Sequence, residues 1–240
     1  MGKQNIYKDL ARYYEIIFSW KNFKNEANVV RKLIKEYKKS KGDLLLDVAC
    51  GTGKHLSYLR RYFSCTGVDL NKQMLNLARK NVSGVTFKQG NMLNFNLKKK
   101  FDIVLCLFGS IGYTRSYKNL KIALISLINH LKPKGVIIIE PWLTRKEYKP
   151  GYKKVIALET GNVSIAGLAI SKLKGDLAII DTHYLIAEND GSVKSFEDRN
   201  EVKLFEIHTI LSLMKKAGLQ VKFLKQSLTQ ARGLLVGVKL

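Results

Sequence analysis

One stretch of the chain, residues 44 to 71, limits the folds that the sequence can adopt. It begins with an apolar run, interrupted only by Asp47, that lacks polar alternation and is typical of a strand buried on both faces. Gly51 and Gly53 follow and favour a tight turn, because glycine tolerates positive φ. A helical run and a second apolar strand, which ends at Asp69, complete the stretch. The stretch therefore predicts a βαβ unit with a ligand site at the carboxyl ends of its strands.

The acids of this unit indicate the kind of ligand. A dinucleotide-binding fingerprint needs a third glycine at the position where this chain has Leu56. Asp47 stands just before the turn, where it would repel a pyrophosphate and suits a positively charged group. Asp69, at the end of the next strand, can accept hydrogen bonds from both hydroxyls of a ribose. A cationic amino group, a ribose and no phosphate describe S-adenosylmethionine.

The remaining sequence alternates strands with helices, which predicts an α/β fold with a doubly wound, Rossmann-like sheet. An aromatic-rich, amphipathic segment at residues 5–39 is expected to be helical. Further strands of the sheet are expected at residues 85–87, 101–108, 136–142, 219–224 and 234–239, and further helices at 54–63, after Asn71, at 117–131 and at 209–217.

The rhythm changes between residues 143 and 204. Four strand-like runs are separated by hairpin signals, of which Asn189-Asp190-Gly191 is an example. The runs are 153–159, 163–173, 177–188 and 193–204. We expect an antiparallel insertion over the active site. The expected parts are an N-terminal helical cap (1–40), a Rossmann-like cofactor-binding core (41–145), the antiparallel insertion (146–204) and a C-terminal helix and hairpin that complete the core (205–240).

Composition restricts the partners. The formal net charge is +23, but 33 of the 42 basic residues are lysines spread along the chain, which is typical of a solvated surface. An anionic or nucleotide-bearing substrate and weak nucleic-acid binding remain compatible with this charge. No apolar run reaches the roughly 18 residues of a membrane span. The three cysteines form no C-x-x-C motif, so we expect no metal and a reducing cytoplasm. A homodimer is compatible with the sequence.

Several segments together resemble one family. The D-x-x-x-G-x-G pattern that starts at Asp47 is similar to the first motif of class I S-adenosylmethionine-dependent methyltransferases. Within that class, the chain resembles the N,N-dimethyltransferases that act on nucleotide-linked amino sugars of macrolide biosynthesis. The similar stretches, in chain order, are residues 14–17, 46–56, 108–113, 136–142 and 232–238. The resemblance implies the cofactor S-adenosylmethionine and a small-molecule amine as the methyl acceptor.

The resemblance also implies roles for individual residues. The residues expected to bind the cofactor are Tyr14, Asp47, Ala49, Gly51, Gly53, Asp69, Leu70, Met74, Asn91, Met92 and Phe108. Those expected to bind the acceptor substrate are Tyr113, Trp142 and Arg232, with the arginine pairing with a substrate phosphate. Asn91 departs from the aspartate usual in the family, but an amide oxygen can still accept a hydrogen bond from the adenine amino group.

A proton acceptor near the substrate amine would help, because the amine must arrive neutral. His183, in an expected insertion strand, is the first candidate, and Glu201 is the second. Tyr14 would reach the reacting centre from the N-terminal segment. The methyl transfer itself demands mainly alignment of two centres and exclusion of water.

Three alternatives stay open. The first is an N-methyltransferase for another small amine. The second is an RNA or DNA methyltransferase, although the chain has no Asn-Pro-Pro-Tyr motif after the fourth strand and Cys106 lacks the preceding proline of cytosine C5 enzymes. The third is a basic binding protein that keeps the fold without activity. The presence of Asp47, Gly51 and Asp69 disfavours this third alternative.

Overall fold

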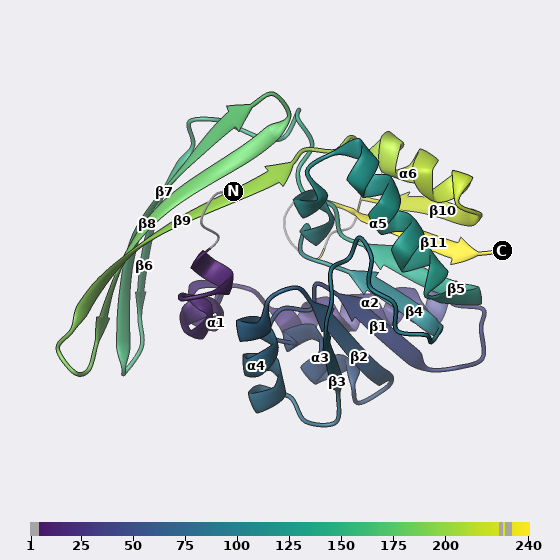
Figure 1. Ribbon diagram of the computed structural model, residues 1–240, viewed down its shortest axis with the longest axis horizontal. Coiled ribbons are helices and arrows are strands. Elements are labelled where there is room, and N and C mark those ends of the chain that lie inside the picture. Colours follow the sequence, from purple (N-terminus) through teal and green to yellow (C-terminus); the bar gives the residue numbers. More distant parts are fainter. Residues whose placement is uncertain (1–4, 226–227, 229–231) are drawn as a thin grey trace.

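A seven-stranded sheet forms the centre of the molecule (Figure 1). The computed structural model describes residues 5–225, 228 and 232–240. The spatial order of the sheet is β10-β11-β5-β4-β1-β2-β3, and the strands from β5 to β3 in this order are parallel, while β11 runs antiparallel to both of its neighbours. The strands are Leu44–Val48 (β1), Ser64–Asp69 (β2), Thr86–Gln89 (β3), Phe101–Cys106 (β4), Leu131–Ile139 (β5), Leu219–Leu224 (β10) and Leu234–Lys239 (β11).

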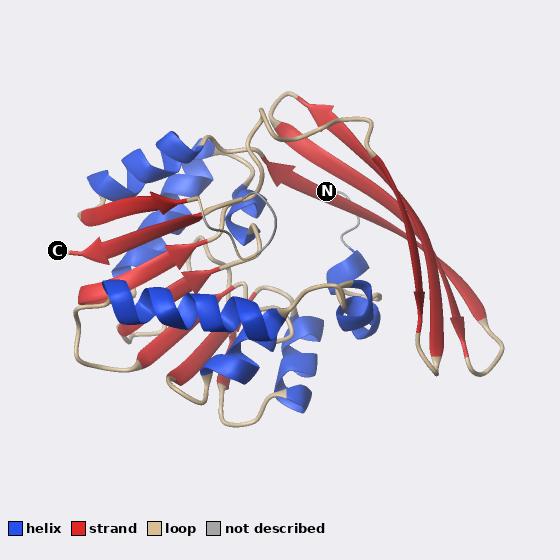
Figure 2. Ribbon diagram, turned by 180° about the vertical axis from the view of Figure 1, so that it is seen from behind, coloured by secondary structure: helices blue, strands red, loops and turns tan. Residues whose placement is uncertain are grey.

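Helices cover both faces of this sheet (Figure 2). Helices α5 and α6 pack on one face, where Leu124 and Met214 meet Val104, and α2, α3 and α4 pack on the other, where Val30 and Leu75 lie. The α-helices are Tyr14–Ile17 (α1), Phe23–Tyr37 (α2), Lys54–Leu59 (α3), Lys72–Asn81 (α4), Tyr117–Asn129 (α5) and Ile207–Lys216 (α6), and the 3-10 turns are Asn5–Tyr7 (η1), Ala11–Tyr13 (η2) and Ser110–Thr114 (η3). The doubly wound α/β fold expected from the sequence is confirmed.

A separate four-stranded antiparallel sheet stands beside the central sheet (Figures 1 and 2). Its order is β6-β7-β8-β9, with strands Lys153–Glu159, Val163–Lys174, Leu177–Glu188 and Val193–Lys203. The expected insertion strands agree with these bounds to within one residue. Local signals suffice here, because alternating side chains and hairpin residues are set by neighbouring positions in the sequence.

The N-terminal segment fills the space between the two sheets. Tyr13 and Ile17 belong to an apolar cluster that joins the antiparallel sheet, through Ile165 and Ile186, to Met74 of α4. In Figure 1 this segment lies between the antiparallel sheet and α4. The segment therefore connects the two sheets, and its position depends on both.

Several expected boundaries differ from those of the structure. The segment 5–39 is largely helical, as expected, but it is divided into short elements, and the chain breaks between α1 and α2, where Lys21 is buried and the Asn22 side chain caps α2 by accepting from Asn25 N. Helix α3 ends at Leu59, four residues before the expected end. Strand β5 starts at Leu131, five residues before the expected start, and the pairing of β4 with β5 shifts register near its beginning.

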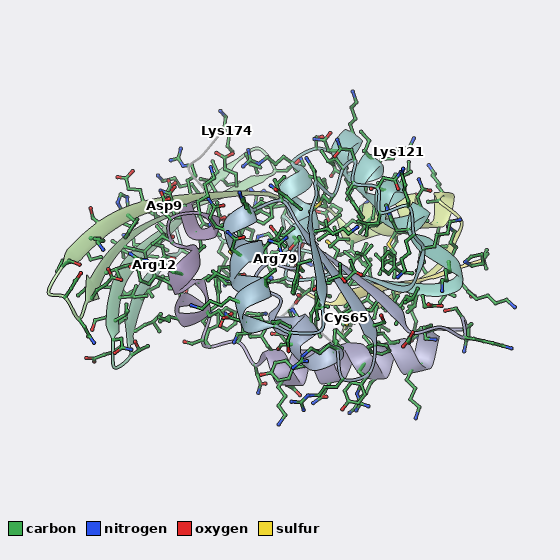
Figure 3. The ribbon with its side chains drawn as sticks, turned by 60° about the horizontal axis from the view of Figure 1, so that its bottom comes forward. Asp9, Arg12, Cys65, Arg79, Lys121 and Lys174 are labelled. Atoms are coloured by element: carbon green, nitrogen blue, oxygen red, sulfur yellow. The ribbon has the colours of Figure 1, made fainter. Side chains whose placement is uncertain are left out.

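The surface and the cysteines agree with an ordinary globular protein. Lys121 and Lys174 extend away from the ribbon on separate elements (Figure 3), and both are exposed. The three cysteines are buried and free. Within the described residues, no helix is long and apolar enough to cross a membrane.

We predict that Gly67→Ala in β2 destabilises the fold. A Cβ atom at this position would lie 2.8 Å from Cys50 Sγ and 2.8 Å from Phe87 Cδ1, so neighbouring groups would have to move. Such overpacking costs about 1–3 kcal/mol. For a chain of this size each kcal/mol lowers the melting temperature by about 2–4 °C. Gly161→Ala is the matched control, because nothing lies within 4 Å of its added Cβ. Equal melting temperatures for the two variants would contradict the packing argument.

Candidate active site

A cavity of about 340 Å³ opens at the carboxyl ends of strands β1 to β4. One end of it is lined by residues that follow these strands, and the other by residues of η1, α1, η3 and the start of α5. The lining includes Tyr7, Tyr14, Asp47, Ala49, Gly51, His55, Asp69, Leu70, Asn91, Met92, Phe108, Ser110, Tyr113 and Arg115. The position is the one that an open α/β sheet reserves for ligands.

The turn between β1 and α3 shapes the first end. Ala49, Gly51 and Gly53 have φ angles of 62°, 57° and 74°, so every second residue of the turn is left-handed. Glycine takes this conformation at little cost, whereas Ala49 is an unusual residue for it. Gly53 does not line the cavity, and an added Cβ there would lie 2.9 Å from the Phe87 ring. Its role is therefore to let the turn pack against β3.

Asp69 closes this end from the tip of β2. Its Oδ2 accepts from Gly51 N at 2.8 Å and its Oδ1 from Asn71 N at 2.8 Å. Burial raises the pKa of Asp69, and these backbone donors oppose the shift. Asn71 Nδ2 also donates to Oδ1, at 3.5 Å. A carboxylate has about four acceptor sites, so one remains, on Oδ2, for a hydroxyl group. The structure thus holds Asp69 in place and leaves it able to bind a ribose.

Asp47 is the least compensated charge in the cavity. It is 2% exposed, and no donor among the described residues forms a hydrogen bond with its carboxylate. Burial raises its pKa to about 7, with His55 opposing and Asp69 adding to the shift. A buried carboxylate without a partner fits a ligand that carries an ammonium group.

The residues after β3 complete the expected cofactor site. Asn91 and Met92 line the cavity, and Asn91 Oδ1 accepts from Leu93 N at 3.0 Å, which leaves the amide one further lone pair. Leu70 also lines the cavity, and the side chain is 57% exposed. Met74 does not line it, since this side chain is buried in the cluster beneath the N-terminal segment.

Aromatic rings line the second end. Tyr14 lies beside Tyr7, with ring centroids 6.0 Å apart, and Tyr7 in turn meets Tyr113 edge to face at 6.0 Å. Burial raises the pKa values of all three phenols, so they stay neutral over the ordinary pH range. Two tyrosines that we expected at the site, Tyr14 and Tyr113, are therefore brought together, and Tyr7 is an addition.

A buried ion-pair network stands behind this wall. Glu26 accepts from Lys21 Nζ at 2.7 Å and bonds His55 Nε2 at 2.7 Å. Burial alone would raise the pKa of Glu26, but its bonds to His55 and Lys21 lower it. Lys21 Nζ also lies 3.9 Å from the centroid of the Phe108 ring. Phe108 is left-handed, with φ of 55°, and its N–H donates to Glu140 at 2.6 Å. The network fixes an otherwise unfavourable backbone at the cavity wall.

Trp142 and Arg232 lie just outside the cavity lining. The Arg232 guanidinium stacks over the Trp142 ring at 3.8 Å and lies 5.3 Å from the Phe108 ring. Burial lowers the pKa of Arg232. Its Nη1 has no hydrogen-bond partner within the described part of the chain. An arginine with an unused buried donor fits an incoming oxyanion.

The two candidate bases of the insertion lie elsewhere. The His183 side chain is 70% exposed on the outer face of the antiparallel sheet, where Nδ1 is 3.7 Å from Glu197. Glu201 forms an ion pair with Arg115 at 3.1 Å, and only the arginine lines the cavity. No residue of β6 to β9 is among the lining residues, so the antiparallel sheet supports the cavity walls without forming them. The position of His183 therefore does not support the expected role.

The sequence patterns did not single out Tyr7, Lys21 or Glu26. They lie in or near a segment so rich in aromatic residues that no one side chain was distinguished. The seven-residue spacing between Tyr7 and Tyr14 was the one sequence signal that could have pointed to Tyr7, because residues seven apart lie on the same face of a helix.

Comparison with known proteins agrees with this geometry. Residues 45–135 match the methyltransferase domain family. The dTDP-3-amino-3,4,6-trideoxy-alpha-D-glucopyranose N,N-dimethyltransferase of Streptomyces venezuelae is 31% identical over 96% of this chain and 98% of its own length. The crystal structure of Streptomyces venezuelae DesVI covers 97% of this chain and 99% of its own, with a TM-score of 0.90 and 31% identity.

A further solved structure contains the cofactor. This is CalS10, an amino pentose methyltransferase from Micromonospora echinaspora with bound S-adenosylmethionine. It has a TM-score of 0.82 and 27% identity, and the match covers 92% of each chain. The fold, the two buried carboxylates and these matches define an S-adenosylmethionine-dependent methyltransferase. The chain belongs to the family of nucleotide-linked amino-sugar N,N-dimethyltransferases.

The residues present fit this cofactor. The Asp47 carboxylate, which has no hydrogen-bond donor among the described residues, suits the ammonium group of its methionine part, and the remaining acceptor site of Asp69 suits a ribose hydroxyl. Asn91 and Met92 would meet the adenine. Bound there, S-adenosylmethionine would supply an activated methyl group on a sulfonium.

We predict that affinity for S-adenosylmethionine falls as the pH drops below about 7. Asp47 must be ionised to bind an ammonium, and a pKa of about 7 leaves it neutral in acid. Linkage then weakens binding by up to about tenfold per pH unit. Asp47→Asn should bind more weakly at pH 8 and show a shallower slope, with Asp69 providing what slope remains. Calorimetric titration at pH 6, 7 and 8 measures both effects.

The control for this prediction is Asp102→Asn. Asp102 is also a buried strand acid, but it lies at the amino end of β4 and bonds Leu44 N and Lys132. This variant should keep the wild-type slope. A wild-type slope in Asp47→Asn would show that another group governs the pH dependence.

Proposed function

We propose that this methyltransferase transfers two methyl groups from S-adenosylmethionine to the amine of a nucleotide-linked amino sugar. The observation that carries the proposal is the 31% identity to amino-sugar N,N-dimethyltransferases over nearly the whole chain, including the insertion. The cavity agrees with such a substrate, because its second end is lined by neutral phenols and hydroxyls that can hold a sugar.

The nucleotide part of the proposed acceptor fits the charge around the cavity. Arg232 offers an unused guanidinium donor beside Trp142, and Arg115 lines the cavity. The net charge of +23 would attract a doubly charged pyrophosphate at long range. Trp142 and Arg232 would therefore receive the phosphate-bearing part, while the amine points towards Tyr7 and Tyr14.

The chain's own contribution to the reaction is positioning. Asp47 and Asp69 would hold the two polar ends of the cofactor and so fix the direction of its methyl group. The rings of Tyr14 and Phe108 exclude water from the reacting centre. Such alignment contributes about 7–11 kcal/mol to a transfer between two bound groups. A strong general base is not required, provided that the amine binds in its neutral form.

A panel of acceptors tests the proposed function. The enzyme is incubated with S-adenosylmethionine and a nucleotide-linked amino sugar, the same sugar without the nucleotide, a small aliphatic amine, or a short RNA. We expect mass gains of one and then two methyl groups on the first acceptor and little change on the others. Methylation of the RNA, or of the aliphatic amine alone, would overturn the assignment of the acceptor and keep the class of enzyme.

We predict that Arg232→Ala raises KM for the nucleotide-linked acceptor. Loss of a charge-assisted hydrogen bond costs about 1.5–3 kcal/mol, which corresponds to an increase of about tenfold to a hundredfold. The KM for S-adenosylmethionine should change little. Arg31→Ala is the control, because Arg31 also stacks on an aromatic ring, at 4.5 Å from Tyr62, but belongs to α2 and does not line the cavity. An unchanged acceptor KM in Arg232→Ala would exclude the phosphate contact.

A further inference from the structure

We propose that a directed chain of hydrogen bonds from Asp198 through Asn200 and Tyr113 makes the Tyr7 hydroxyl an acceptor towards the cavity, where it orients the substrate amine. This inference rests on the proposed function, since it concerns the amine. Neither Tyr7 nor Asp198 was predicted from the sequence. The hydrogen bonds link Tyr7 of η1 to Tyr113 of η3, and Tyr113 to Asn200 and Asp198 of β9.

The chain of hydrogen bonds from Tyr7 to Asp198 is continuous. Tyr7 Oη lies 2.7 Å from Tyr113 Oη, and Tyr113 Oη donates to Asn200 Oδ1 at 2.9 Å. Asn200 Nδ2 donates to Asp198 Oδ2. Asp198 is 3% exposed, and its other oxygen accepts from Ile6 N at 2.9 Å. The chain thus leads from the cavity wall to a buried carboxylate of the antiparallel sheet.

The direction of each bond follows from the carboxylate. Burial raises the pKa of Asp198 to about 6, so at pH 8 it is ionised and can only accept. Asn200 must then present its NH₂ group to Asp198 and its oxygen to Tyr113. Tyr113 gives its single proton to Asn200 and can only accept from Tyr7. Tyr7 donates its only hydroxyl proton to Tyr113, so towards the cavity its oxygen can only accept a hydrogen bond.

This direction suits an amine that is to be methylated. Tyr7 lines the cavity, and its raised pKa keeps the phenol neutral. An N–H of the bound amine can donate to Tyr7 Oη, which leaves the nitrogen lone pair free for the transfer. If the direction were reversed, the Tyr7 proton would bind that lone pair and compete with the reaction.

The same contact accounts for two transfers. Each transfer forms an N–C bond with the amine lone pair and breaks the S–C bond, whose electrons stay on sulfur, and the resulting ammonium loses one proton to water. A primary amine and its monomethyl product both retain an N–H that can donate to Tyr7. The neutral dimethyl product has none, so it loses this contact and is released.

An isosteric substitution tests the direction. In Asp198→Asn, the new amide must turn its oxygen to Ile6 N and its NH₂ group to Asn200. Asn200 then rotates and donates to Tyr113, so Tyr113 donates to Tyr7. At pH 8 we expect kcat to fall by about tenfold, the value of one hydrogen bond, with affinity for S-adenosylmethionine unchanged. Tyr7→Phe should show a similar loss.

The exchange Asp198→Asn with Asn200→Asp is the decisive variant. It places an acceptor-only carboxylate beside Tyr113 and a donor amide at position 198, which restores the original direction with the same net charge. We expect kcat to return towards wild type. A buried residue with a merely structural role would give no such rescue. If Asp198→Asn has wild-type kcat, or if the folded exchange variant stays as slow as Asp198→Asn, the proposal is wrong.

Two controls come from neighbouring residues. Tyr13→Phe removes a hydroxyl that donates to Glu188 at 2.9 Å and does not line the cavity. Asp181→Asn alters a second buried acid of the sheet, which is bonded to Lys172. Both should keep wild-type kcat. Should the exchange variant fail to fold, Tyr7→Phe combined with Asp198→Asn decides. If the double variant loses no more kcat than either single variant, the two residues act through one chain of hydrogen bonds. Additive losses of kcat overturn the proposal.

Neutron diffraction separates this inference from the proposed function. In deuterated crystals at pD 8, the deuteron between Tyr7 and Tyr113 should be bonded to Tyr7 Oη, whichever acceptor the enzyme methylates. A deuteron on Tyr113 would overturn the direction. If wild type methylates no amino sugar while the deuteron lies on Tyr7, the acceptor assignment fails and the hydrogen-bond chain remains.

Discussion

The burial of the Asp47 carboxylate is the constraint on which the rest of the site depends. Its folded-state pKa of about 7 lies above the unfolded value of about 3.9. A raised pKa means that the folded state loses stability as the pH rises from about 4 to about 7. At neutral pH the ligand-free protein therefore carries a partly ionised, unpaired acid. A cationic ligand offsets this penalty, so the group that weakens the fold is the group that selects the cofactor.

The second end of the cavity depends on long-range packing. Most of its residues come from short elements that have little stability of their own, since η1, α1 and η3 contain three to five residues each. The antiparallel sheet holds them, because Ile6 N donates to Asp198 at 2.9 Å and the cluster that contains Ile6 and Tyr14 also includes Ile165 and Ile186 of the sheet. The insertion thus contributes to function by fixing the wall residues, although none of its residues lines the cavity.

Local signals explain what could be predicted from the sequence. The turn after β1 and the hairpins of the insertion are encoded by adjacent residues, and they were found. The alternation of side chains along a strand also explains the position of His183. Thr182 and Tyr184 are buried on one face of the sheet, so His183, which lies between them in the sequence, faces the other side. Tyr7 and Asp198 could not be found, because they come together only when η1 docks on β9.

Two of the buried acids, Asp47 and Asp198, lie at different distances from the bound groups for a physical reason. Asp47 is suited to contact a group that must stay charged. An acid in contact with the acceptor amine would instead stabilise its ammonium form, which has no lone pair to react. Asp198 is separated from Tyr7 Oη by three hydrogen bonds, through Asn200 and Tyr113, so in our proposal it sets the direction of Tyr7 without holding a proton on the amine. In our proposal the second end of the cavity therefore favours the neutral, reactive form of its substrate.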